Sequence, residues 1–175
     1  MSDVPTVVEM TRGGSKAELP LSSLFVEDDS LHFDYGHSLP NSESCCVIHG
    51  HSSRLSVELF GYQKDDGMIL DFGIAKRIIK SVIEGFDHKY VIGSKYVRII
   101  DGRARVSFSG PKGRIEIDVP KEHLVILEGE ATSENIVNEL SRRLMESLPV
   151  EVVAIKAFFF EGTNKGAAVF RKREK

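Results

Sequence analysis

One segment, residues 49–59, indicates how this chain folds: it reads His49-Gly50-His51-Ser52-Ser53-Arg54-Leu55-Ser56-Val57-Glu58-Leu59. Its second half alternates apolar and polar residues, which is the pattern of a strand with one buried face. If the strand begins at the His-Gly-His, His49 and His51 point to the same face, because side chains in a strand repeat every two residues. Two imidazoles about 6–7 Å apart on one face can bind a single metal ion. The segment therefore predicts a strand that carries a site.

Three of the six histidines are candidate metal ligands. His37 lies a polar loop upstream of His49 and His51, and the glycine between the last two leaves room for close backbone approach. Three nitrogen ligands leave a fourth position open, which is typical of catalytic rather than structural zinc. The alternative is that they are ordinary surface or core histidines, as we interpret His32 and His123.

Cys45 lies four residues before His49 and is followed directly by Cys46. Adjacent cysteines cannot form a disulfide framework, and a bridge between them would be strained. Because the first residues also lack a basic region, the sequence indicates no signal peptide and a reduced, cytoplasmic protein. Cys45 is then either a nucleophile or base beside the metal or a small buried apolar residue.

The composition is that of a soluble globular domain. The chain has 175 residues, 41% hydrophobic and 28% charged, which suffices for one domain with a sizeable core. A net charge of −3 and a pI near 6.1 argue against nucleic-acid binding. No stretch approaches the ~18 apolar residues of a membrane span. The basic run at residues 171–175 is interpreted as a solvated tail.

Two amphipathic helices are marked by caps and by apolar spacing. Asp71 is a good N-cap for a helix that runs to about Phe86, and Thr132 begins a second helix that Pro149 ends. Strands before, between and after the helices predict an α+β fold, with an antiparallel sheet and both helices on one face. The strands are expected at Leu24–Val26, Leu31–Tyr35, His49–Gly61, Tyr96–Ile100, Arg103–Ser109, Arg114–Val119, Val152–Phe160 and Ala167–Phe170.

Two further polar features are candidates for chemistry. Asp87-His88 directly follows the first helix, and it is either a surface turn or an imidazole oriented by a carboxylate to act as a general acid. Glu161 ends an apolar strand, where a carboxylate is costly unless it has a partner. A guanidine-like edge of a ligand would be a suitable bidentate donor to it.

Taken together, these segments resemble the family of 6-pyruvoyltetrahydropterin and 6-carboxytetrahydropterin synthases. Each motif is weak alone, but all occur in the family's order between residues 33 and 170. The motifs are Phe33-Asp34-Tyr35-Gly36-His37-Ser38-Leu39-Pro40, Cys45-x-x-x-His49-Gly50-His51, Gly67-Met68-Ile69-Leu70-Asp71-Phe72, Phe86-Asp87-His88-Lys89-Tyr90, Thr132-Ser133-Glu134-Asn135 and Glu161-Gly162.

The resemblance implies a role for each candidate residue. It implies that the three histidines bind Zn²⁺, that Cys45 accepts a proton, and that Asp87 and His88 form a relay on the other face of the substrate. Glu161 would anchor a pterin ring. The residues that would line the pterin pocket are Thr132, Ser133, Glu134 and Glu161.

The position of the cysteine separates the branches of the family. Cys45, four residues before His49, resembles the branch that converts 7,8-dihydroneopterin triphosphate to 6-carboxy-5,6,7,8-tetrahydropterin in the 7-deazaguanine (queuosine and archaeosine) route. In the 6-pyruvoyl branch more residues separate the cysteine from the His-Gly-His. A third branch, which forms 6-hydroxymethyl-dihydropterin, has a glutamate where this chain has Cys46. A protein that binds a pterin or purine without turnover is the non-enzymatic alternative.

The resemblance also implies an assembly. Family members have the tunnelling fold (T-fold), in which the sheets of a trimer close into a barrel and two trimers stack as a homo-hexamer. Pockets lie between subunits, so some site residues would serve a neighbouring chain. We expect residues 1–20 to be an N-terminal extension, 21–171 one domain with an insertion at about 91–130, and 172–175 a charged tail.

Overall fold

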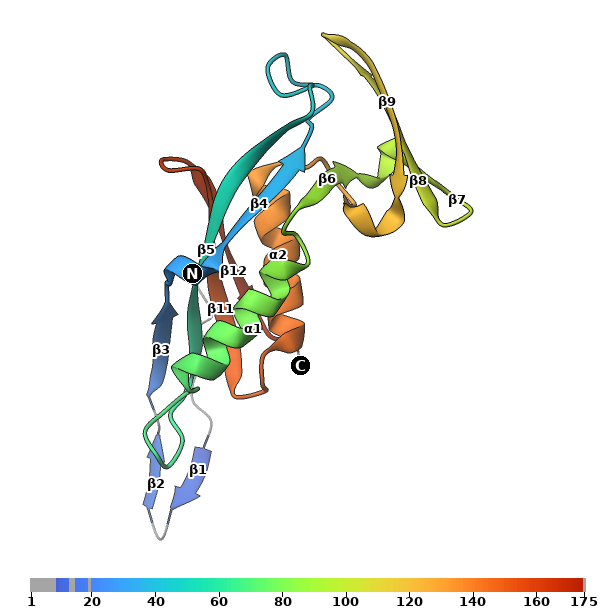
Figure 1. Ribbon diagram of the computed structural model, residues 1–175. Helices are drawn as coiled ribbons and strands as arrows, with labels where there is room; N and C mark the ends of the chain where they lie inside the picture. Colours follow the sequence, from blue (N-terminus) through green and yellow to red (C-terminus); the bar gives the residue numbers. More distant parts are fainter. Residues whose placement is uncertain (1–8, 13–14, 19, 175) are drawn as a thin grey trace.

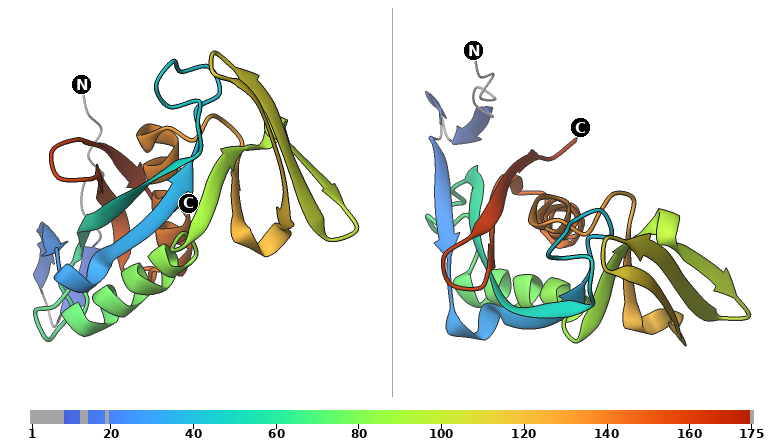
Figure 2. Two further views of the ribbon diagram at one scale, coloured as in Figure 1. Left: turned by 45° about the horizontal axis from the view of Figure 1, so that its top comes forward. Right: turned by 90° about the horizontal axis from the view of Figure 1, so that it is seen from above.

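The computed structural model describes residues 9–12, 15–18 and 20–174. It has the predicted α+β architecture: one curled seven-stranded sheet, two helices packed on one side of it, and a separate three-stranded sheet that projects from one end (Figures 1 and 2). Within the described residues, no helix is long and apolar enough to cross a membrane.

The long strand β5 (His49–Tyr62) organises the main sheet. On one side its first half pairs with β4 (His32–His37) and its second half with β3 (Leu21–Val26). On the other side it pairs with β11 (Val152–Glu161), which in turn pairs with β12 (Gly166–Lys172). All of these neighbours are antiparallel, as the alternating sequence predicts.

The two helices cover the apolar face of this sheet (Figure 1). Helix α1 spans Phe72–Glu84 and α2 spans Ser133–Ser147. Asp71 caps α1 by accepting a hydrogen bond from the Ile74 N–H at 3.0 Å. Their buried residues join those of the strands in one core cluster, which includes Leu55, Val57, Leu59, Ile79, Phe86, Ile136, Leu140, Leu144 and Phe159.

The sheet is mixed, so the prediction of a purely antiparallel sheet is wrong. Strand β6 (Lys89–Gly93) runs parallel to β4, and β10 (Leu124–Leu127) runs parallel to β6. Both strands are too short to give a clear alternating pattern. Each reaches its parallel neighbour through a long connection, which parallel pairing requires.

Between β6 and β10 the chain forms the three-stranded sheet, which we call the meander. Its strands are antiparallel and match the predicted ranges closely: β7 (Val97–Ile100), β8 (Arg103–Gly110) and β9 (Gly113–Pro120). Val106 and Phe108 pack with Ile92 of β6 in a small second core. Short 3-10 turns flank these elements at Asp29–Leu31, Ser94–Tyr96 and Lys121–His123.

Both ends of the described chain make regular contacts. Within residues 1–20, β1 (Glu9–Arg12) pairs with β2 (Ser15–Glu18), while residues 1–8, 13–14 and 19 lie outside the described residues. At the other end, β12 continues through Lys172. Arg173 then donates hydrogen bonds to the carbonyls of Leu148, Pro149 and Val152 at 2.9–3.0 Å, so the predicted tail is bound to the end of α2.

Replacement of the α1 cap tests the local account of this helix. Asp71→Ala removes the acceptor for the Ile74 N–H, so we expect the free energy of unfolding to fall by about 1 kcal/mol. Asp71→Asn keeps an acceptor and is expected to stay close to the original chain. Urea unfolding followed by circular dichroism at a fixed protein concentration measures both variants, and equal losses in the two would contradict the cap.

Candidate metal centre and active site

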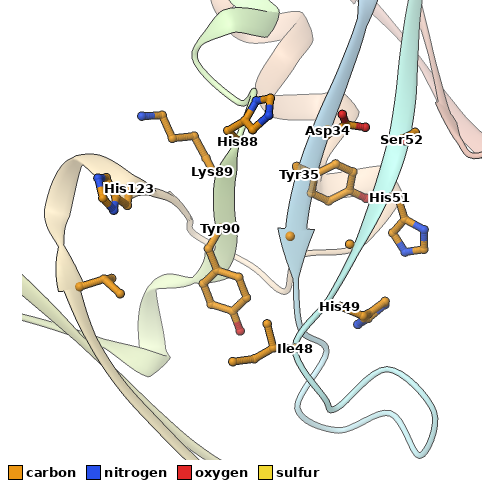
Figure 3. A pocket seen from close by; sticks show the side chains of 13 residues that line it. Asp34, Tyr35, Ile48, His49, His51, Ser52, His88, Lys89, Tyr90 and His123 are labelled. Atoms are coloured by element: carbon orange, nitrogen blue, oxygen red, sulfur yellow. The ribbon is translucent and has the colours of Figure 1, made fainter.

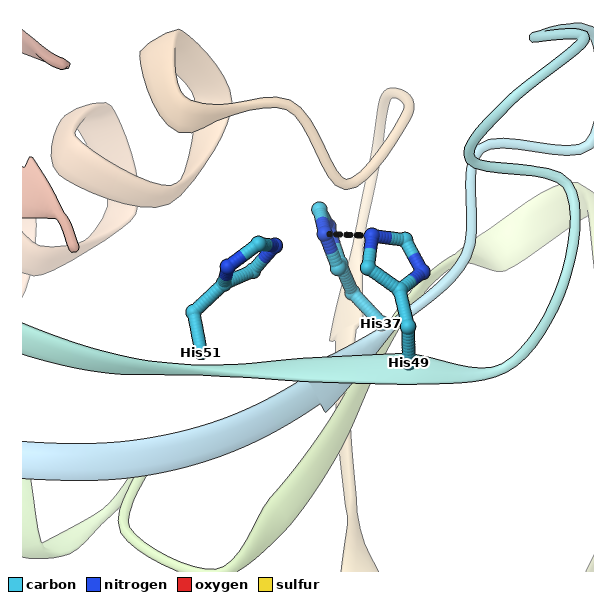
Figure 4. A group of neighbouring side chains, drawn as sticks. All are labelled: His37, His49 and His51. Atoms are coloured by element: carbon cyan, nitrogen blue, oxygen red, sulfur yellow. Dashed lines mark hydrogen bonds between the residues drawn. The ribbon is translucent and has the colours of Figure 1, made fainter.

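The pairing of β4 with β5 brings His37, His49 and His51 together (Figure 4). His37 lies opposite His49, and Tyr35 lies opposite His51. The ligand atoms of the three histidines all lie within 4.8 Å of one another. The strands come close here because residue 50 is glycine: a Cβ at Gly50 would lie 2.8 Å from the Tyr35 carbonyl oxygen.

Two of these imidazoles have a defined tautomer. The Nδ1 of His37 lies 2.7 Å from the Ala131 carbonyl oxygen, and the Nδ1 of His49 lies 2.9 Å from the Val47 carbonyl oxygen. A carbonyl only accepts, so both Nδ1 atoms carry the proton and both Nε2 atoms offer a lone pair. These two Nε2 atoms are 3.1 Å apart, and two acceptors at that distance need a proton or a cation between them. The donor set therefore fits a divalent metal such as zinc.

Burial keeps the histidines in the ligating form. Desolvation lowers the pKa of His37, and the neighbouring His49 adds to this effect against the opposing Ala131 hydrogen bond and Glu161 charge. Desolvation also lowers the pKa of His51, although the Glu161 carboxylate opposes it. Both rings are thus neutral near pH 7, which is the form that binds metal ions.

Glu161, at the end of β11, lies beside this group. Its Oε1 accepts a hydrogen bond from the Tyr35 hydroxyl at 2.7 Å and is 3.7 Å from His37 Nε2 and 3.6 Å from His51 Nε2. Lys165 Nζ is 3.2 Å from Oε2. Burial tends to raise the pKa of Glu161, but the bonds from Tyr35 and Lys165 outweigh it, so the pKa is lowered and the carboxylate is ionised. The buried carboxylate thus has the partners that its position requires.

Tyr35 is a site residue that the sequence analysis did not single out. It is buried, and desolvation followed by its bond to Glu161 raises its pKa, so the hydroxyl stays a donor. Its place two residues before His37 on the same strand could have indicated that both point to one face.

The predicted pocket residues Thr132, Ser133 and Glu134 form the start of α2. Thr132 is the N-cap, and its Oγ1 accepts a hydrogen bond from the Asn135 N–H at 3.4 Å. Since Ala131 holds His37 through its carbonyl, this helix start follows directly on the residue that orients a ring of the histidine group.

Asp87 and His88 form a hydrogen-bonded pair on the side of β4 opposite to the histidine rings (Figure 3). His88 has a positive φ of 56° and its N–H donates to the Asp34 carbonyl at 2.7 Å, while Asp87 Oδ1 accepts from the Asp34 N–H at 2.9 Å. Asp87 Oδ2 is 2.9 Å from His88 Nδ1, which orients the ring. Burial tends to raise the pKa of Asp87, but its hydrogen bonds with Asp34 and His88 outweigh this effect and lower the pKa. The positive φ of His88 is held by these hydrogen bonds to the backbone of Asp34.

His88 borders a cavity of about 690 Å³. In Figure 3 the His88 ring lies on one side of β4, and the His49 and His51 rings lie on the other. His49, His51, Lys89, Tyr90 and His123 line the same cavity. One chain therefore places His88 and two of the three grouped histidines along a single cavity, with their rings on opposite sides of β4 (Figure 3).

Cys45 is not one of the grouped ligand residues. It lies in the loop of residues 38–48 that joins β4 to β5, which we call the cysteine loop, and it is half-buried. Its Sγ is 3.4 Å from the Ser44 hydroxyl. Cys46 is buried, with 3% of its surface exposed. Of the two thiols, Cys45 is thus the accessible one.

Comparison with known proteins identifies the family. The model of the 6-pyruvoyl tetrahydropterin synthase family matches residues 28–173. The chain therefore belongs to this family.

Relatives carry the name of one branch of it. A provisionally named 6-carboxy-5,6,7,8-tetrahydropterin synthase of Pyrococcus abyssi is 28% identical over 144 residues, covering 82% of this chain and 85% of that protein. The 6-carboxy-5,6,7,8-tetrahydropterin synthase of Rickettsia typhi is 25% identical over 124 residues, covering 69% of this chain and 80% of that protein.

Solved structures share the fold. The 6-pyruvoyltetrahydropterin synthase of Plasmodium vivax, in a variant whose catalytic glutamate is replaced by alanine, matches with a TM-score of 0.75 and 20% identity, covering 88% of this chain and 99% of that one. The Plasmodium falciparum protein matches with a TM-score of 0.74 and 21% identity, covering 87% and 99%.

Metal analysis tests the histidine group. We expect purified protein to contain about one zinc ion per chain and His49→Ala to lose it, because two nitrogen ligands hold zinc poorly. His123→Ala is the matched control, since His123 lies outside the group, and it should keep the metal. Elemental analysis after dialysis measures the content. Stoichiometric zinc in His49→Ala would refute the ligand assignment.

Proposed function

We propose that this protein is a zinc-dependent lyase that converts 7,8-dihydroneopterin triphosphate to 6-carboxy-5,6,7,8-tetrahydropterin. Triphosphate and acetaldehyde leave and one water is consumed, so the reaction balances without a redox cofactor. The observation that carries the proposal is the group of three imidazoles whose ligand atoms lie within 4.8 Å of one another, beside the ionised Glu161.

Each candidate residue of this chain would have a separate role in the reaction. Zinc, when held by the three histidines, would act as a Lewis acid on the hydroxyl groups of the substrate side chain. Cys45 would take a proton, and His88, oriented by Asp87 at 2.9 Å, would deliver one. The two groups need opposite protonation states for this exchange.

The pterin ring would be bound at Glu161 and at the start of α2. An ionised carboxylate suits the 2-amino and N3–H edge of a pterin, because the two donors can meet its two oxygens. Lys165, exposed and paired with Oε2, would give way to such a ligand, while Tyr35 would keep Oε1 in place. Thr132, Ser133 and Glu134 would border the same ring.

The position of Cys45 in the cysteine loop supports the 6-carboxy branch of the family. Cys45 lies four residues before His49, and the relatives from Pyrococcus and Rickettsia are named for the 6-carboxy product. Where the Plasmodium vivax protein has a catalytic glutamate, we propose that this chain uses a thiol. Turnover at Cys45 is the feature that distinguishes our proposal from a protein that only binds a pterin.

We further propose that the complete site is shared between subunits of a homo-oligomer, with trimers closing a barrel and two trimers forming a hexamer. The histidine group and the Asp87–His88 pair lie on opposite sides of β4 in one chain. Strands β10 and β12 are open sheet edges, which proteins usually cover. On the face without helices, Phe25 and Phe170 are 51% and 52% exposed. Contact with other copies would cover both features.

A product assay tests the reaction. We expect 7,8-dihydroneopterin triphosphate to yield 6-carboxytetrahydropterin, triphosphate and acetaldehyde, as measured by mass spectrometry with an aldehyde trap. The 6-pyruvoyl or 6-hydroxymethyl product would assign another branch. Ligand binding without any product would favour the binding protein.

Paired cysteine variants test the proton acceptor. We expect Cys45→Ala to lower kcat by about 10³-fold, the usual effect of losing an acid–base group, with zinc retained. Cys46→Ala is the matched control at the neighbouring position and should retain turnover, because that thiol is buried in packing. An inactive Cys46→Ala beside an active Cys45→Ala would identify the other thiol.

A further inference from the structure

The cysteine loop is held internally by turn hydrogen bonds alone. It contains no helix or strand, and its own bonds are those of short turns: Leu39 N–H donates to the Cys45 carbonyl at 2.8 Å, Ser42 N–H donates to the Leu39 carbonyl at 2.9 Å, and Cys45 N–H donates to the Ser42 hydroxyl at 3.2 Å. Loops of this kind need neighbouring elements to hold one conformation. The neighbour here is the meander: the hairpin at which β8 ends and β9 begins lies beside the loop in both views of Figure 2.

The end of β8 presses directly on the loop. A Cβ at Gly110 would lie 2.6 Å from the Pro40 carbonyl oxygen and 3.0 Å from the Cys46 Cβ. Contacts this short do not occur for real Cβ atoms, so only glycine allows the two backbones to approach. The same contact explains why Cys46 is buried. Cys46 is thus part of the packing between loop and meander, and Cys45 is its neighbour in the chain.

A second contact joins the base of the meander to the loop through Glu130. Its Oε1 accepts hydrogen bonds from the Tyr96 hydroxyl at 2.8 Å and from Asn41 Nδ2 of the loop at 3.4 Å, and it pairs with Lys95 Nζ at 2.6 Å. Glu130 also precedes Ala131, whose carbonyl holds His37. One carboxylate therefore links the meander, the cysteine loop and the residue that orients a candidate metal ligand.

We propose that the meander is a brace for the cysteine loop, and that Gly110 and Tyr96 are positioning residues for the Cys45 thiol. The link to catalysis rests on the proposed function of Cys45, whereas the brace itself is a property of the fold. A displacement of a reacting group by about 1 Å costs up to about 10²-fold in rate, so small shifts of the loop are expected to matter.

The test compares three variants in a Cys46→Ala background, which leaves one thiol and keeps the Cβ that Gly110 contacts. Gly110→Ala would push the loop away from β8. Tyr96→Phe removes the hydroxyl that bonds Glu130 but keeps the ring, which packs edge-on against Phe108 at 5.7 Å. Gly102→Asn is the matched control at the other end of β8, where a Cβ would meet nothing within 4 Å and asparagine tolerates the φ of 76°.

Two readouts follow the thiol. The first is the rate of Cys45 alkylation by iodoacetamide, which needs no substrate, and the second is kcat with the proposed substrate. We expect Gly110→Ala to raise the alkylation rate about fivefold or more and to lower kcat about tenfold or more, with zinc content and KM nearly unchanged. For Tyr96→Phe we expect changes in the same directions of about fivefold, as one lost hydrogen bond of ~1 kcal/mol implies.

Gly102→Asn should leave both rates within about twofold of the background. Unchanged alkylation and kcat in both Gly110→Ala and Tyr96→Phe would overturn the brace, and so would equal changes in Gly102→Asn. If Gly110→Ala does not fold, Tyr96→Phe decides alone. If the starting protein does not turn over the substrate, the proposed function fails, while the alkylation rates still test the brace.

Discussion

The register of β5 against β4 is the constraint on which the rest of this structure depends. Leu55, Val57 and Leu59 are completely buried beneath the helices, and residues of the same parity at the start of the strand are His49 and His51. A slip by one residue would turn the leucines and the histidines outward together. Burial of the apolar side chains in the core therefore fixes the face to which the imidazoles point. The interactions that stabilise the fold also position the site.

Two buried proton donors at the polar end of this face have partners. His37 donates to a carbonyl and Tyr35 donates to Glu161, whereas the buried Ser53 hydroxyl has no hydrogen-bond partner. Also unpaired is a set of imidazole lone pairs that face one another at 3.1 Å. Such an arrangement is unfavourable for a structural cluster and favourable for a metal site, because a cation can accept what the protein cannot.

The other candidate catalytic groups are held by elements different from those that carry the histidines. The Asp87–His88 pair is fixed by the backbone of Asp34, and Cys45 sits on a loop that packs against the meander. Each of these groups is thus fixed locally, on its own element. The meander, which adds no proposed catalytic group, acquires a role in this arrangement because it holds the loop.

Much of this could be predicted from short segments. The strand at residues 49–61, both helix caps and the strands of the meander follow from local periodicity and turn chemistry, which nearest neighbours along the chain control. The grouping of His37 with His49 and His51 was also accessible, since strand geometry and family motifs both indicated it. Strands β6 and β10 were not, because segments of four or five residues lack a readable period and pair only through contacts distant in sequence.

The same limit applies to the site. Residue types and spacing sufficed to identify the histidines, Cys45, Asp87, His88 and Glu161 as chemically important. Tertiary contacts alone revealed that Tyr35 binds Glu161, that Ala131 orients His37 and that Gly110 supports the cysteine loop. The sequence determines which side chains can do chemistry. Hydrogen-bond partners and close backbone contacts form between segments that are far apart in the sequence, and only the packing of the folded chain brings these segments together.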